Sequence, residues 1–319
     1  MDLLLSICAL VLTVGVLFPV VRIFRRWKQS EEEEKHELEK SFYLTYSAVI
    51  IVLGIRLFMV PLYFWTMQGF VPVIPGAMCL WGVFDAYPAI TWGALPLKFL
   101  LPAAYLGWLL LSYLNAKSKT HPLMQNLMAL FILLVPLLII DSGTDILTFS
   151  QLSPIEVNCC TSAIDVGTRP VPGSIAGMSG QVFLVLVFFA LAAMFALTVF
   201  LSLRHRIAHW FSLALTIPLS GVLVLTMTEV FAPWLLNLPF HHCPFCLLVD
   251  HPVSIVFTAV IWFAVAVPWL VLITGRLGRE DVESKEAEGK LRRKLLIYAG
   301  IAMIAALLII MVDLLIVLL

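Results

Sequence analysis

Long apolar runs divide this sequence into eight segments that are each long enough to cross a lipid bilayer. They lie at about 3–24, 42–66, 95–114, 122–141, 180–203, 211–233, 253–275 and 295–319. An α-helix needs about 20 mainly apolar residues to span the hydrocarbon layer. Within that layer a helix satisfies its own backbone hydrogen bonds, whereas irregular chain exposed to lipid does not. The runs therefore predict an all-α, polytopic bundle of about eight transmembrane helices, surrounded by the lipid bilayer.

The composition supports a membrane location and gives no sign of a nucleic-acid partner. The 319-residue chain is 61% hydrophobic and only 13% charged, with a mean hydropathy of +1.02. So few charges cannot cover the surface of a soluble protein of this size. The sequence shows neither a nucleic-acid-binding motif nor a glycine-rich phosphate loop. We expect residues 1–319 to form a single transmembrane domain that binds no nucleic acid.

The distribution of basic residues predicts which connections face the cytoplasm. Seventeen of the 20 lysines and arginines fall in alternate connections, at 22–40, 115–121, 204–210 and 276–294. By the positive-inside rule these connections are cytoplasmic, so both termini lie outside. The charged cytoplasmic segments at about 25–41 and 276–294 contain Glu–Lys pairs typical of solvated helical extensions. The expected location is a bacterial cytoplasmic (inner) membrane.

Three long connections, at about 67–94, 142–179 and 234–252, are predicted to face the extracytoplasmic side. Loops of this length in a compact protein are usually functional or disordered, and these are rich in aromatic residues. They hold five of the six cysteines, namely Cys79, Cys159, Cys160, Cys243 and Cys246, whereas Cys8 lies in the first apolar run. In an oxidising compartment a thiol stays reduced only when it binds a metal or is kept reduced for a purpose. The sequence therefore predicts a shared cysteine centre at the outer face.

The motif LPFHHCPFCLLVDHP, at residues 238–252, contains a C-x-x-C pair. The leading hypothesis is that this pair is a working dithiol, with Cys243 as the attacking thiol and Cys246 as the resolving thiol. The cysteines of the other two outer loops would relay the disulfide. An extracytoplasmic redox protein or a lipid-soluble quinone would exchange the electrons. The protein would then be an integral membrane redox protein and, if an enzyme, a thiol-disulfide or quinone-linked oxidoreductase.

The same motif also suits a soft metal ion. Thiolate sulfur and imidazole nitrogen are ligands that zinc and copper(I) bind in proteins. His241, His242, Cys243 and Cys246 supply a set of this kind within one loop. The alternative hypothesis is therefore a membrane protein that binds or delivers copper or zinc.

A third hypothesis gives the cysteines only a structural role. Disulfides would pin the outer loops, as is common in exported proteins. The protein would then be a non-catalytic membrane anchor subunit of a respiratory complex. The adjacent residues Cys159 and Cys160 fit this hypothesis poorly, because a disulfide between neighbours strains the peptide bond that joins them.

Several ionisable residues lie within the apolar runs or at their outer ends. They are Arg56, Lys98, Asp141, Asp145, Glu229 and Asp313. A charge inside a bilayer is costly, so such groups pair with each other or line a hydrated cavity. We expect Arg56 either to form a structural ion pair with an acid, or to join Glu229 in a polar pocket for a cofactor such as a quinone headgroup. A proton path is a further alternative.

Overall fold

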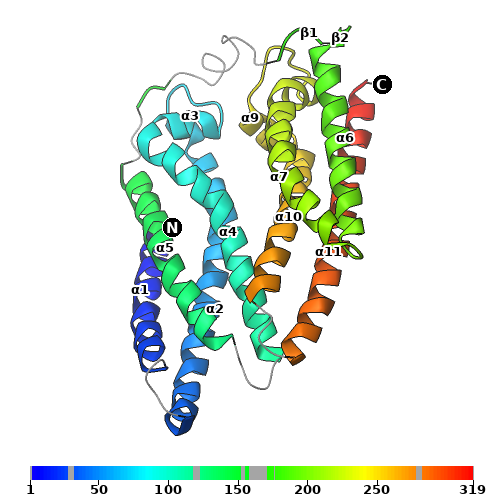
Figure 1. Cartoon of the computed structure of the whole chain (residues 1–319). Coiled ribbons are helices and arrows are strands. Elements are labelled where there is room, and N and C mark those ends of the chain that lie inside the picture. The colour runs from blue at the N-terminus through cyan, green and yellow to red at the C-terminus, as the bar shows by residue number, and fades with distance from the viewer. Residues whose placement is uncertain are drawn as a thin grey trace. The chain divides into compact units, whose positions relative to one another are not determined.

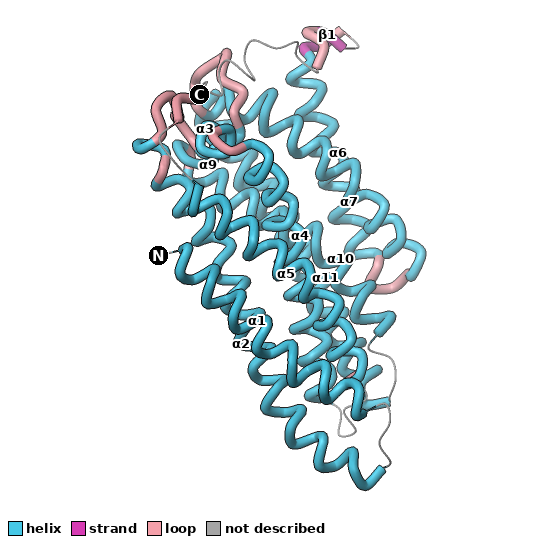
Figure 2. The backbone as a smooth tube through the Cα atoms, turned by 90° about the vertical axis from the view of Figure 1, so that its left-hand side faces the viewer, coloured by secondary structure: helices cyan, strands magenta, loops and turns pink. Residues whose placement is uncertain are grey.

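A computed structural model describes the chain at residues 2–27, 32–117, 123–151, 155–157, 171–175, 177–277 and 282–318 (Figure 1). Eight helices within these ranges are long and apolar enough to cross a membrane. Figure 2 shows that the described connections between helices are short loops, apart from one small hairpin. The predicted all-α architecture is confirmed, and the number of helices suited to span a membrane agrees with the eight predicted spans. These eight helices support the interpretation that the chain is an integral membrane protein.

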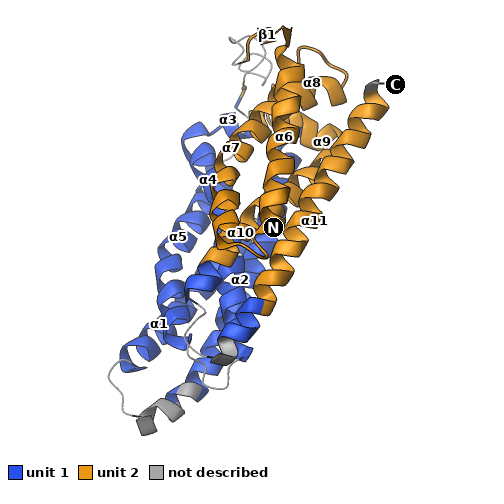
Figure 3. Cartoon of the chain, turned by 45° about the vertical axis from the view of Figure 1, so that its right-hand side comes forward, with its two compact units in different colours: residues 1–73, 83–155, 273–289 blue, residues 74–82, 156–272, 290–319 orange. Residues whose placement is uncertain are grey.

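The chain divides into two compact units (Figure 3). Unit 1 consists of residues 1–73, 83–155 and 273–289. Unit 2 consists of residues 74–82, 156–272 and 290–319. A single transmembrane domain stays a prediction.

Four long helices form most of unit 1. They are α1 (Asp2–Trp27), α2 (Glu32–Gly69), α4 (Pro88–Lys117) and α5 (Met124–Gln151). Helix α1 packs against α2 and α5, and α4 packs against α5 and α2. Leu53 of α2, Leu114 of α4 and Phe131 of α5 are fully buried. The short elements η1 (Val71–Val73) and α3 (Leu80–Asp85) lie between α2 and α4 in the sequence.

Helices α4 and α5 extend well beyond the apolar runs that predict them. The sequence indicates an end of the fourth span near residue 141, whereas α5 continues to Gln151. The helix tolerates Asp141 and Asp145 in its interior because both carboxylates are paired with a buried lysine. Helix α4 begins at Pro88 instead of near residue 95. Proline is favourable in a first helical turn, where its missing N–H would have no partner.

Unit 2 contains the remaining long helices and several short elements. The long helices are α6 (Gly180–Leu201), α7 (Arg206–Thr226), α10 (Pro252–Leu277) and α11 (Val282–Leu318). The last residues of α10 and the first residues of α11 fall within 273–289, which belongs to unit 1. A π-helix, η3 (Met227–Phe231), follows α7 and leads into α8 (Ala232–Leu235) and α9 (Pro244–Asp250). The hairpin of β1 (Ser174–Ile175) and β2 (Met178–Ser179) precedes α6.

Three phenylalanine rings from three elements form the centre of the unit 2 core. Phe231 of η3 lies 5.8 Å from Phe188 of α6 and 5.8 Å from Phe257 of α10, measured between ring centroids. All three rings meet edge to face, which is a favourable arrangement of aromatic quadrupoles. The rings are fully buried. This cluster joins the π-helix to two long helices.

The aromatic cluster leads to a stability prediction. Phe231→Ala should leave a cavity between Phe188 and Phe257 and lower the stability by about 3–5 kcal/mol. The measurement is thermal unfolding of the purified protein in detergent. Phe240→Ala is the matched control, because the Phe240 side chain is 75% exposed. An equal loss of stability in both variants would contradict the assignment of Phe231 to the core.

Candidate functional site

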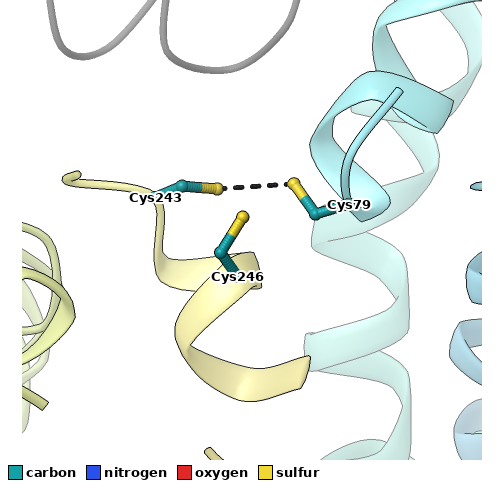
Figure 4. A group of neighbouring side chains, drawn as sticks. All are labelled: Cys79, Cys243 and Cys246. Carbon is teal, nitrogen blue, oxygen red and sulfur yellow. Dashed lines mark hydrogen bonds between the residues drawn. The ribbon is translucent and has the colours of Figure 1, made fainter. Parts of the chain in front are cut away.

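Three cysteines predicted to share a centre come together in unit 2 (Figure 4). The Sγ atoms of Cys79 and Cys243 are 3.6 Å apart, although 164 positions separate the residues in the sequence. The Sγ atom of Cys246 completes a group in which all three sulfurs lie within 4.8 Å of one another. A disulfide bond measures about 2.05 Å, so the Cys79 and Cys243 sulfurs are in contact without being bonded. We call these three residues the cysteine centre.

Helix α9 positions two of the three thiols. Cys243 has extended backbone angles, with φ −82° and ψ 114°, and directly precedes the helix. The N–H of Leu247 donates a hydrogen bond to the Cys243 carbonyl over 3.2 Å, which begins the helical pattern. Pro244 occupies the first helical turn, where proline is favourable. Because residues three apart lie on the same helical face, the C-x-x-C spacing directs Cys243 and Cys246 to one side.

The third thiol is held by a tight turn in the segment 74–82. Gly76 has a positive φ of 85°, a conformation that glycine adopts without steric cost. A Cβ atom at Gly76 would lie 2.1 Å from the carbonyl oxygen of Val157, so a larger residue cannot fit. The Val157 N–H also donates a hydrogen bond to the Pro75 carbonyl over 3.0 Å. These contacts fix the turn that ends at Cys79, immediately before α3.

The surroundings of the cysteine centre are apolar. Cys79 and Cys243 are each 1% exposed, and Cys246 is 6% exposed. Trp81, Leu236 and Phe245 pack against the thiols. Burial in such a shell penalises an isolated negative charge. The centre therefore favours neutral thiols, or thiolates whose charge is compensated by a bound cation.

The two neighbouring histidines lie outside the described group of close sulfur atoms. In the described part of the chain, the group of ligand atoms within 4.8 Å contains three cysteines and neither His241 nor His242. The buried His242 places its Nδ1 atom 3.1 Å from the carbonyl oxygen of Thr228 in η3. The His241 N–H donates to the Leu238 carbonyl in a turn. The structure thus joins the C-x-x-C pair with Cys79, and a ligand role for the histidines stays a prediction.

The remaining cysteines have different positions. Cys159 and Cys160 lie outside the described residues, so their predicted relay role stays a prediction. Cys8 is exposed on α1 in unit 1. Cys8 is therefore a suitable control position for substitutions in the cysteine centre.

Arg56 forms the ion pair with an acid that one of the sequence hypotheses predicts. Its Nη1 atom lies 3.4 Å from Asp141 Oδ2, within unit 1. Its Nη2 group donates a hydrogen bond to Thr13 Oγ1 over 3.1 Å. Glu229 is buried in η3 of unit 2, where its backbone carbonyl accepts a hydrogen bond from the Gln181 side chain. A cofactor pocket formed by Arg56 and Glu229 stays a prediction.

Lys98 is the centre of a larger buried charge network in unit 1. Its Nζ atom lies 2.7 Å from Asp141 Oδ1 and also 2.7 Å from Asp145 Oδ1. Together with Arg56, the network contains two cations and two carboxylates contributed by α2, α4 and α5. The sequence identifies these residues as ionisable groups within or next to apolar runs, but it does not predict which of them form ion pairs. The spacing of four between Asp141 and Asp145 is the one available signal, because it places both on one helical face.

Comparison of the chain with protein-family models, curated proteins and solved structures finds no match.

The contact between Cys79 and Cys243 predicts which disulfide forms first under mild oxidation. Copper(II)-phenanthroline should produce mainly a Cys79–Cys243 disulfide, since these sulfurs need to move little to bond. Mass spectrometry of unreduced peptides identifies the pair. Cys8→Ala should give the same product as the wild type, whereas Cys243→Ala should not. A Cys243–Cys246 disulfide as the main product would contradict the observed contact.

The charge network predicts a compensating pair of substitutions. Lys98→Met leaves Asp145 without its cation and should cost about 3–5 kcal/mol, as expected when a buried ion pair loses one partner. Adding Asp145→Asn restores electrical neutrality, because Arg56 still balances Asp141. The double variant should therefore unfold at a higher temperature than Lys98→Met alone, measured in detergent. Simple addition of two losses would show that the charges are not coupled.

Proposed function

We propose that this integral membrane protein binds a soft metal ion, copper(I) or zinc, through the thiolates of Cys79, Cys243 and Cys246. The observation that carries the proposal is the approach of three buried sulfurs to within 4.8 Å of one another. Thiolates bound to one ion at about 2.3 Å lie about 4 Å apart. The ion would therefore need only small movements of the three side chains.

The ligand types favour copper(I) over zinc. Thiolates are soft ligands, and copper(I) accepts low coordination numbers with sulfur ligands alone. Structural zinc is almost always bound by four ligands, so zinc would need a fourth donor in addition to the three thiolates. The apolar shell of Trp81, Leu236 and Phe245 excludes competing water from the bound ion. A positive ion would also offset the charge of the buried thiolates.

The proposed role is binding and delivery of the ion at the extracytoplasmic face of a bacterial inner membrane. The location follows from the positive-inside rule applied to the basic connections. A three-coordinate ion leaves space for a ligand from a partner, so transfer can proceed by exchange of one sulfur at a time. The proposed partner is an extracytoplasmic protein with soft ligands of its own.

Anaerobic titration with copper(I) tests the metal proposal. The purified protein, kept reduced in detergent, competes with a coloured copper(I) chelator, which reports the affinity. Cys79→Ser, Cys243→Ser and Cys246→Ser should each weaken binding at least about tenfold, or by about 1.4 kcal/mol. Cys8→Ser is the matched control and should bind like the wild type. Unchanged binding by Cys79→Ser would refute a centre that uses all three thiols.

The 3.6 Å contact between Cys79 and Cys243 favours a second candidate, thiol–disulfide exchange. Cys243 would attack a partner disulfide, and Cys246 or Cys79 would resolve the mixed disulfide. Oxidation of two thiols releases two electrons and two protons, which together convert a quinone to a quinol. In this candidate Arg56 and Glu229 are the proposed groups for the quinone headgroup. Disulfides that only staple the loops of a respiratory anchor subunit are the remaining, non-catalytic alternative.

A quinone assay separates the two chemical candidates. The reduced, metal-free protein is mixed with a soluble quinone, and thiols and quinol are counted together. The redox candidate requires the loss of two thiols for each quinol formed, and this activity should disappear in Cys243→Ser. A metal site alone predicts an unchanged thiol count. Neither copper binding nor quinone reduction is expected of a structural staple.

A further inference from the structure

The buried charge network of unit 1 is electrically balanced but uneven between its two acids. Asp141 interacts with two cations, Lys98 at 2.7 Å and Arg56 at 3.4 Å. Asp145 has Lys98 as its ion-pair partner, with both carboxylate oxygens 2.7 Å from the Nζ atom. Protonation of Asp145 therefore affects one cationic partner, whereas protonation of Asp141 affects two. Lys98 stays paired with Asp141 when Asp145 becomes neutral.

Four buried hydroxyl groups belong to the same helices. Tyr63, Tyr105, Ser142 and Thr148 have hydroxyl oxygens with no hydrogen-bond partner among the described residues. Each of these side chains is more than nine-tenths buried. An unsatisfied buried polar group costs about 1–3 kcal/mol, and internal water commonly supplies the missing hydrogen bonds. The four hydroxyls therefore indicate bound water within unit 1.

Two of these hydroxyls lie beside the network. Thr148 follows Asp145 by three positions in α5, so both side chains lie on one helical face. The Nζ atom of Lys98 lies 4.6 Å from the centre of the Tyr63 ring. A tyrosine hydroxyl both donates and accepts hydrogen bonds, so it can hold a water molecule beside a carboxylate.

We propose that Asp145 is a proton-binding site inside the apolar helices of unit 1, supplied by water held at these four hydroxyls. A hydronium ion donates its proton to the Asp145 carboxylate, which forms a new O–H bond and leaves a water molecule. The net charge of the network changes from zero to +1, and release of the proton to water reverses the step. Ionisable groups within membrane-spanning helices commonly serve proton transfer. This proposal is independent of the function proposed for the cysteine centre.

The groups that face Asp145 come from every helix packed around it. Helix α2 contributes Arg56 and Tyr63, and α4 contributes Lys98 and Tyr105. Helix α5 contributes Asp141 itself. From α1, the Thr13 hydroxyl accepts a hydrogen bond from Arg56 and adds no charge. The proton balance at Asp145 therefore depends on two cations and one further acid.

Infrared difference spectroscopy of the full chain tests the proposal. Spectra are recorded in detergent as the pH is lowered from neutral, for the wild type and Asp145→Asn. The wild type should show an additional protonated-carboxyl band that Asp145→Asn lacks. The band should shift on isotopic labelling of aspartate carboxyl carbons, which assigns it to aspartate in the intact wild type. It should also shift when D2O replaces H2O. Asp85→Asn, in the same unit but outside the network, is the matched control and should keep the band.

Three results would overturn the proposal. A wild type without an aspartate band that depends on pH has no such proton site. A band kept in Asp145→Asn but lost in Asp141→Asn assigns the proton to the other carboxylate. A band that does not shift in D2O shows that water does not reach the site. Asp145→Glu keeps the carboxyl group and should restore a shifted band, which guards against loss of the band through misfolding.

Discussion

The cost of a charge in an apolar medium is the constraint on which unit 1 depends. Lys98 and Arg56 lie within long apolar helices, where a single charge costs about 2.5–3.5 kcal/mol even on the most favourable scale. Asp141 and Asp145 remove that cost only because α2, α4 and α5 bring all four groups together. The pairing therefore selects the way in which these helices pack. It also keeps titratable carboxylates inside apolar helices, where gain or loss of a proton changes the net charge of the network.

The cysteine centre follows the same principle with different atoms. Its three sulfurs lie in an apolar shell, where a thiol is accommodated easily but an isolated thiolate is not. A soft cation bound by all three sulfurs satisfies that requirement, and so does a disulfide between two of them. Both outcomes use the same small distances between sulfur atoms. Metal binding uses all three thiols, whereas a disulfide uses two, and this difference favours the metal.

The two units thus contain two separate kinds of chemistry. The charge network of unit 1 is a balanced set of hard, ionised groups with nearby hydroxyls. The cysteine centre of unit 2 is a soft ligand set in an apolar shell, and the adjacent His242 is held by the π-helix. Protons and water are the ligands proposed for the first cluster, and a soft metal ion or a disulfide partner is proposed for the second.

The apolar runs of the sequence are enough to predict the eight helices, because each run has the length that the hydrocarbon layer requires. The sequence also predicts a common centre for Cys79, Cys159, Cys160, Cys243 and Cys246, because these cysteines fall in three connections on the same predicted side of the membrane. The approach of the three sulfurs to one another is visible only in the tertiary structure. It depends on a turn at Gly76 that Val157 closes. The continuation of α5 beyond Asp141 likewise depends on Lys98, which is 47 positions from Asp145 in the sequence. Contacts between distant segments leave no local pattern, so composition and spacing could not reveal them.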